Sequence, residues 1–120
     1  MQTVPRFCTL DGFVEISETL EGVELRALAP NGTILVRTRE SDYRILLLDP
    51  ASRRVLIEGG PFFAEPTEAI LSGSSFGGCL LRMGWIGHGL RMEIHAQGRL
   101  VVTSPVRSLR VEGVARGAVW

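Results

Sequence analysis

The chain has 120 residues and no net charge, because 13 basic residues balance 13 acidic ones. All of the basic residues are arginine, and the balance excludes a protein that binds nucleic acid through bulk positive charge. A hydrophobic content of 45% with 22% charged residues excludes a disordered chain and is typical of one folded domain. We expect a single domain over residues 1–120, with residues 1–16 and 113–120 as flexible ends.

One helix is expected, near the start of the chain. Over residues 17–28 the apolar side chains recur at helical spacing, and Ser17 can cap the first turn. The run Pro30-Asn31-Gly32 then ends the helix. Residues 7–16, which precede it, are expected to form a short hairpin around Asp11-Gly12.

Strands are expected from residue 33 onward. Residues 33–39 alternate, with Ile34, Val36 and Thr38 on one face and Leu35, Arg37 and Arg39 on the other. Residues 43–48 are apolar nearly throughout, which predicts a strand covered on both faces. After a turn, the chain returns as a short strand over residues 55–58.

The second half of the chain is rich in glycine and predicts further short strands separated by turns. Pro105 is expected to break the last strand, and residues 72–78 are expected to form a loop. Phe62 and Phe63 are expected to form an edge strand or a crossing segment. After them, the expected strands cover residues 67–71, 80–86, 90–95, 100–103 and 106–112. Seven or eight short strands without helical crossovers predict a mainly β fold, a small antiparallel β-barrel or roll with one short N-terminal helix.

The apolar runs are short. The longest purely aliphatic run, residues 45–48, falls far below the roughly 20 residues that a helix needs to cross a bilayer. The first residues lack the pattern of a secretory signal, so we expect a cytoplasmic protein without a membrane partner. In that compartment Cys8 and Cys79 are expected to be free, buried and inert, with a disulfide or redox pair as the alternative.

Arginines supply the candidate ligand-binding residues. Guanidinium groups bind phosphate through paired hydrogen bonds and stack on bases. Arg37 and Arg39 share one face of a predicted strand, and Arg44 lies on the next hairpin. The alternative is that coding preference favours arginine and that these side chains pair with the glutamates. The full candidate set for an anionic ligand is Arg37, Arg39, Arg44, Arg54, Trp85, His88 and Arg91.

Histidine offers an enzymatic alternative. His95 shares the polar face of its strand with Glu93, which could orient the imidazole for base catalysis, and His88 lies between two glycines. The competing interpretation is a solvated strand face. No spacing of histidines, cysteines and acids matches a metal site, and the Gly-x-Ser-x-Gly string at residues 73–77 lacks the strand-to-helix turn of a hydrolase. We therefore expect no metal, no cofactor and no catalytic residue.

Two resemblances add to these patterns. Residues 33–39, 82–93 and 102–107 resemble a small uncharacterised bacterial all-β family, which implies a fold without implying an activity. Residues 70–81, ILSGSSFGGCLL, are similar to the second motif of PilZ domains, where an acid or amide, a serine and a glycine help hold cyclic di-GMP. Ser75 and Gly78 match that motif, whereas Gly73 stands where the acid or amide belongs. The leading arginine motif of PilZ domains, Arg-x-x-x-Arg, is absent, and the pair that comes nearest to it is Arg53-Arg54.

Three functions follow as hypotheses. The first is an interaction module that self-associates or binds a protein through an exposed strand edge. The second is a binding module for an anionic ligand, such as a nucleotide, cyclic di-GMP or nucleic acid, held by a local arginine patch. The third, ranked last, is an enzyme that uses Glu93, His95 and His88.

Overall fold

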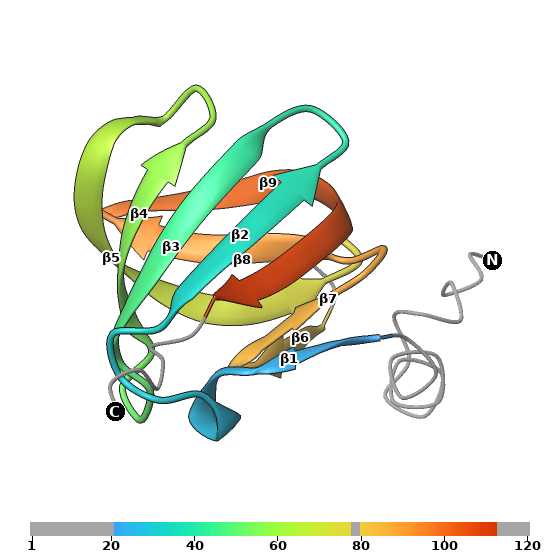
Figure 1. The fold of residues 1–120 in the computed structure, drawn as a ribbon. Helices are drawn as coiled ribbons and strands as arrows, with labels where there is room; N and C mark the ends of the chain where they lie inside the picture. Colours follow the sequence, from blue (N-terminus) through green and yellow to red (C-terminus); the bar gives the residue numbers. More distant parts are fainter. Residues whose placement is uncertain (1–20, 78–79, 113–120) are drawn as a thin grey trace, which may run out of the picture.

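The computed structural model describes residues 21–77 and 80–112, and these residues are mainly β, as the sequence predicts (Figure 1). One short 3-10 turn, η2 (Leu25–Ala27), follows the first strand. In chain order the strands are β1 (Gly22–Glu24), β2 (Thr33–Thr38), β3 (Asp42–Asp49), β4 (Arg54–Gly59), β5 (Phe63–Ser75), β6 (Leu81–Met83), β7 (Trp85–Gly87), β8 (Arg91–Ala96) and β9 (Arg99–Glu112).

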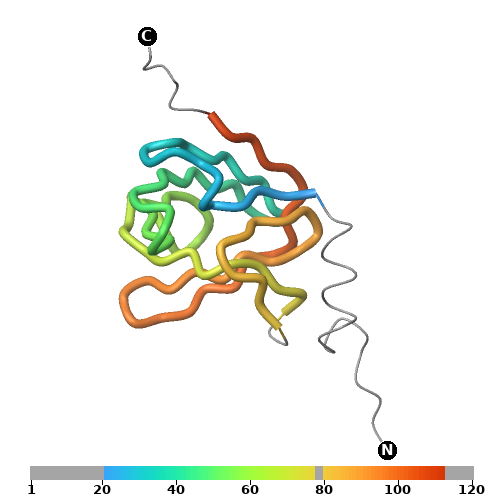
Figure 2. The backbone as a smooth tube through the Cα atoms, turned by 90° about the horizontal axis from the view of Figure 1, so that it is seen from below, coloured from blue at the N-terminus to red at the C-terminus, as the bar shows by residue number. Residues whose placement is uncertain are grey.

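The larger sheet joins its strands in the order β4-β3-β2-β9-β8-β5-β6, each pair antiparallel. β4 also pairs with β5, so the ladder that leaves β4 through β3 returns to it through β5. The length of β5 makes this possible, because its first part pairs with β4 and its later part with β8 as the strand curves (Figure 1). β1 and β7 form a separate two-stranded sheet, whose strands lie side by side in Figure 2.

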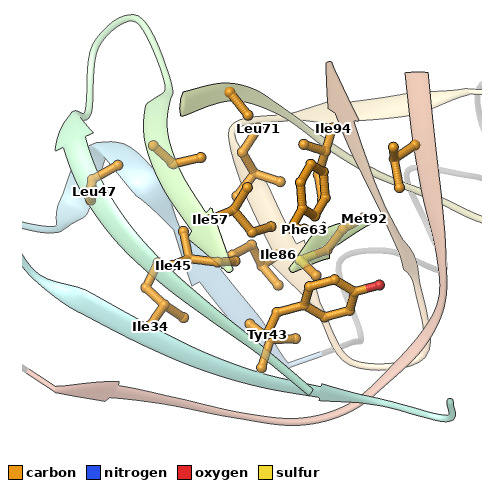
Figure 3. Close-up of a cluster of buried hydrophobic side chains, with 14 of the residues drawn as sticks. Ile34, Tyr43, Ile45, Leu47, Ile57, Phe63, Leu71, Ile86, Met92 and Ile94 are labelled. Carbon is orange, nitrogen blue, oxygen red and sulfur yellow. The ribbon is translucent and has the colours of Figure 1, made fainter. Parts of the chain in front are cut away.

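The core lies inside the larger sheet and is built by the alternation of the strands. In β2, Ile34, Val36 and Thr38 are buried, which confirms the face expected from the sequence. Side chains from opposite strands, including Ile45, Ile57, Leu71 and Ile94, meet in the same cluster (Figure 3). The prediction that both faces of residues 43–48 are covered is wrong. Tyr43, Ile45 and Leu47 are buried, Arg44 is exposed, and Leu46 and Leu48 are half-buried.

The expected helix over residues 17–28 is also wrong in its described part. Residues 22–24 form β1 and pair with β7, and only the single turn η2 follows. A β-carbon at Gly22 would lie 2.4 Å from the Trp85 ring, so the extended chain packs against the indole in a way that only glycine permits. Pairing and packing therefore override a weak helical stripe that already contained glycine. Residues 17–20, the expected hairpin at 7–16 and both cysteines lie outside the described residues.

Three expected boundaries in the second half differ from the structure. The expected strand over 80–86 is divided into β6 and β7 because Gly84, at φ +66°, turns the chain between them. The expected loop over 72–78 begins later, since β5 continues to Ser75 and the serines at 74 and 75 are fully buried. Pro105 does not end a strand. It lies within β9, where the chain passes from pairing with β8 to pairing with β2.

Within the described ranges, η2 is the only helical element, and no helix is both long and apolar enough to cross a membrane.

Candidate functional site

Three arginines converge on the outer face of β9, β2 and β3. Leu35 of β2 lies directly between Arg44 of β3 and Arg110 of β9, its two cross-strand partners. One step along the same face, Arg37 is paired with Asp42 on one side and Ser108 on the other. Because successive side chains of a strand point to opposite faces, Leu35 and Arg37 share the outward face while Ile34 and Val36 enter the core. We call Arg37, Arg44 and Arg110 the arginine face.

The arginine face borders a pocket of about 620 Å³. Half-buried leucines contribute apolar surface, and two acidic residues, Asp42 and Glu58, stand among the guanidinium groups. A pocket with apolar surface and a few convergent charged groups has the composition of a small-molecule site. Its lining residues are Leu35, Val36, Arg37, Asp42, Tyr43, Arg44, Glu58, Ser108, Leu109 and Arg110.

The three guanidinium groups differ in their partners. Arg37 Nε donates to Asp42 Oδ1 at 3.0 Å, and this hydrogen bond and the carboxylate charge raise the pKa of Arg37 above its ordinary value. Arg110 pairs with Glu112 at 3.2 Å. Arg44 forms no ion pair with any described residue, although Glu58 is its cross-strand neighbour on β4. Exposed pairs are weak and salt-sensitive, so Arg37 and Arg110 can exchange their partners for a ligand anion.

The structure divides the arginines that the sequence grouped together. Arg37 and Arg44 meet in the pocket, but Arg39 pairs with Glu40 at the β2–β3 turn at 3.2 Å. Arg54 pairs with Glu68 of β5 at 2.9 Å and does not line the pocket. Sequence reasoning missed Arg110. The alternation of the strand expected over 106–112 could have placed Arg110 on the outward face. Only the pairing of β9 with β2 brings Arg110 beside Leu35.

Trp85 and His88 lie at a different place. They line a second pocket of about 520 Å³ with Glu21, Gly22 and Leu109, beside the small β1–β7 sheet. The Trp85 indole packs against the backbone of Gly22, and the guanidinium of Arg82 lies 3.9 Å from the ring centroid. His88 Nδ1 lies 3.5 Å from Glu21 Oε1. Trp85 therefore packs beside the β1–β7 sheet and does not line the pocket of the arginine face.

The remaining candidates hold parts of the fold together. Arg91 donates to the carbonyl of Thr103 at 3.3 Å. The Ser75 hydroxyl, fully buried, donates to Glu93 Oε2 at 2.5 Å. Glu93 has no hydrogen bond or ion pair with His95 among the described residues, so the pair that the enzymatic alternative requires is not formed. In residues 21–77 and 80–112, no group of three or more potential metal ligands comes together.

The segment similar to the second PilZ motif is a strand up to Ser75. Ser75 accepts a hydrogen bond from the Gly77 amide and donates its own proton to Glu93. At Gly73, at φ +153°, a β-carbon would lie 2.1 Å from the carbonyl oxygen of Arg82, so glycine is required there for close packing of β5 on β6.

Comparison with protein-family models, curated proteins and solved structures finds no match to this chain.

Proposed function

We propose that this chain is a non-enzymatic binding module, a small antiparallel β-barrel whose arginine face holds an anionic ligand. The return of the strand ladder from β5 to β4 supports the barrel. The observation that carries the binding function is the cross-strand row in which Leu35 separates Arg44 from Arg110 beside a pocket of about 620 Å³.

The chemistry of the pocket favours a nucleotide-sized ligand. Guanidinium groups supply paired donors for a phosphate, and the leucine surface suits a planar or apolar part of the same molecule. Asp42 and Glu58 limit the positive charge of the pocket, and the whole chain is neutral, so a long nucleic acid is a poorer partner than a small anion. Cyclic di-GMP belongs to the class that fits, although the serine of the PilZ-like segment bonds to Glu93 instead of lining this pocket.

Calorimetric titration with a panel of nucleoside mono- and diphosphates and cyclic di-GMP tests the proposal. Arg44→Gln removes the one guanidinium of the arginine face that has no described ion pair, and should weaken binding about tenfold or more. Arg54→Gln is the matched control, because Arg54 is an exposed arginine outside the pocket. Equal losses in both variants, or no binding by the unmodified protein, would contradict the proposal.

A second candidate function, self-association, is favoured by the first half of β9. Residues 99–102 pair with β8 but with no second described strand, and they carry two exposed hydrophobic side chains, Leu100 at 51% and Val102 at 42% exposure. Phe62, 56% exposed, stands near the same end, with the guanidinium of Arg99 5.9 Å from its ring centroid. An open apolar strand edge can pair with the same edge of a second copy.

Sedimentation equilibrium distinguishes this candidate. Val102→Lys places a charge on the open edge and should convert a dimer into a monomer, whereas Met83→Lys, at another exposed hydrophobic residue on β6, should not. A chain that is monomeric at high concentration before any substitution would refute self-association.

A further inference from the structure

Arg53 is a half-buried residue whose guanidinium has no counterion among the described residues. It ends the β3–β4 turn in the left-handed region at φ +63°, and its carbonyl accepts a hydrogen bond from the Leu71 amide at 3.0 Å. Its Nε is buried and has no hydrogen-bond partner, and the guanidinium forms no ion pair with a described residue. Buried polar donors are nearly always satisfied, so such a group calls for a partner that no described residue supplies.

The surroundings of Arg53 form a small pocket with a second cation. The pocket, of about 220 Å³, is lined by Glu24, Arg26, Arg53, Met83 and Gly84. Gly84 lies between Arg53 and Glu24: a β-carbon at Gly84 would be 3.7 Å from both Arg53 Cδ and Glu24 Oε1. Arg53, at the end of the β3–β4 turn, and Arg26, in η2, line one pocket from separate segments of the chain.

We propose that this pocket binds a phosphate group between Arg53 and Arg26. Two guanidinium groups match the oxygens of a tetrahedral anion, and one of them offers a buried donor that no described residue satisfies. The volume suits a phosphate and falls below the roughly 300 Å³ at which sites for drug-sized ligands begin. The site is independent of the proposed function, since it shares no residue with the pocket of the arginine face.

A variant of Glu24 distinguishes phosphate binding from the simpler explanation that Glu24 itself is the counterion of Arg53. Glu24 is the one acidic residue that lines the pocket, yet its carboxylate has no ion pair with Arg26 or Arg53 within 4.0 Å in the described structure. If Glu24 acts as the counterion of Arg53 in solution, removing its charge lowers stability and leaves phosphate binding unimproved. If the ligand is a phosphate, removing the like charge of Glu24 strengthens binding.

The test is a titration of the whole chain with inorganic phosphate at constant ionic strength, followed by the nuclear magnetic resonance shifts of the Arg53 and Gly84 amides. We expect saturable shifts that Arg53→Gln weakens about tenfold or more, Arg26→Gln weakens to a smaller degree, and Glu24→Gln strengthens. Arg54→Gln and Arg44→Gln are controls for the neighbouring arginine and for the arginine face, and both should leave the titration unchanged.

Repeating the titration with adenosine monophosphate distinguishes two sources of the phosphate. Tighter binding of inorganic phosphate indicates a free phosphate, and tighter binding of adenosine monophosphate indicates the terminal phosphate of a larger ligand. Unsaturable shifts, equal binding by Arg53→Gln, or a Glu24→Gln variant that loses stability without gaining affinity would overturn the proposal. Loss of binding in Arg44→Gln but not in Arg53→Gln would assign the phosphate to the arginine face instead.

Discussion

Arg110 is the direct cross-strand neighbour of Leu35, although most of the chain separates them in sequence. This single pairing turns two arginines on adjacent strands into a group of three around an apolar side chain, and it creates the pocket on which the proposed function depends. The acidic residues of that pocket, Asp42 and Glu58, limit its net charge, and under the proposed function they would restrict the charge of the ligand that it holds.

Ligand binding at the arginine face should weaken with salt. Because charged groups at an exposed site are screened, we expect affinity for a nucleotide to fall severalfold between low and physiological ionic strength. In Arg44→Gln the slope of affinity against salt should be smaller, since one cationic contact is gone. Calorimetry across a sodium chloride series measures both, and a slope that is unchanged in the variant would argue against a contact with Arg44.

Gly73 should tolerate no side chain. In Gly73→Ala the added β-carbon would meet the Arg82 carbonyl oxygen at 2.1 Å, so we expect a loss of about 3 kcal/mol or more in the free energy of unfolding. Gly98 also has a positive φ, of +76°, but a β-carbon there meets nothing within 4 Å. Gly98→Ala should therefore cost only about 1 kcal/mol, from backbone strain alone. Urea unfolding measures both, and equal costs would show that packing on β6 is not the cause.

Adjacent leucines on β3 test the single buried face of that strand. Leu47 is fully buried and Leu46 only half-buried. We expect Leu47→Ala to lower the free energy of unfolding by about 3 kcal/mol, because it leaves a cavity in the core, and Leu46→Ala by about 1 kcal/mol. If the two variants are equally destabilised in chemical denaturation, the strand is covered on both faces after all.

We expect the protein to lose stability at alkaline pH because of Tyr43, the single tyrosine of the chain. Burial raises the pKa of its hydroxyl above the ordinary value of 10.0. Since the folded-state pKa is the higher one, the stabilising effect of the neutral phenol is complete below about pH 10 and is lost as the pH rises through the folded-state pKa. Ultraviolet titration should show late ionisation in the folded protein, and Tyr43→Phe should remove this part of the pH dependence. Ionisation at or below the pKa of free tyrosine would disprove the prediction.

Parts of the fold that depend on local pattern could be predicted. The alternation of Ile34 and Val36 with Leu35 and Arg37 identified the buried face of β2. The outward position of Arg44 was not predicted, because residues 43–48 were expected to be covered on both faces. Errors came where partners from distant segments decide the structure. Residues 22–24 are extended because β7 pairs with them, and Pro105 remains within β9 because β8 and β2 hold the strand on either side of it.

The sequence by itself determined a neutral, lysine-free, mainly β chain and the face on which Arg37 lies, because side-chain direction along a strand is a local property of the backbone. Only the tertiary structure decided which arginines meet. Strand register joins Arg110 to Leu35 and sends Arg54 to Glu68, and the close approach of β6–β7 leaves Arg53 half-buried beside Gly84. Register depends on the summed packing of the whole core, and no single segment of the sequence contains that information.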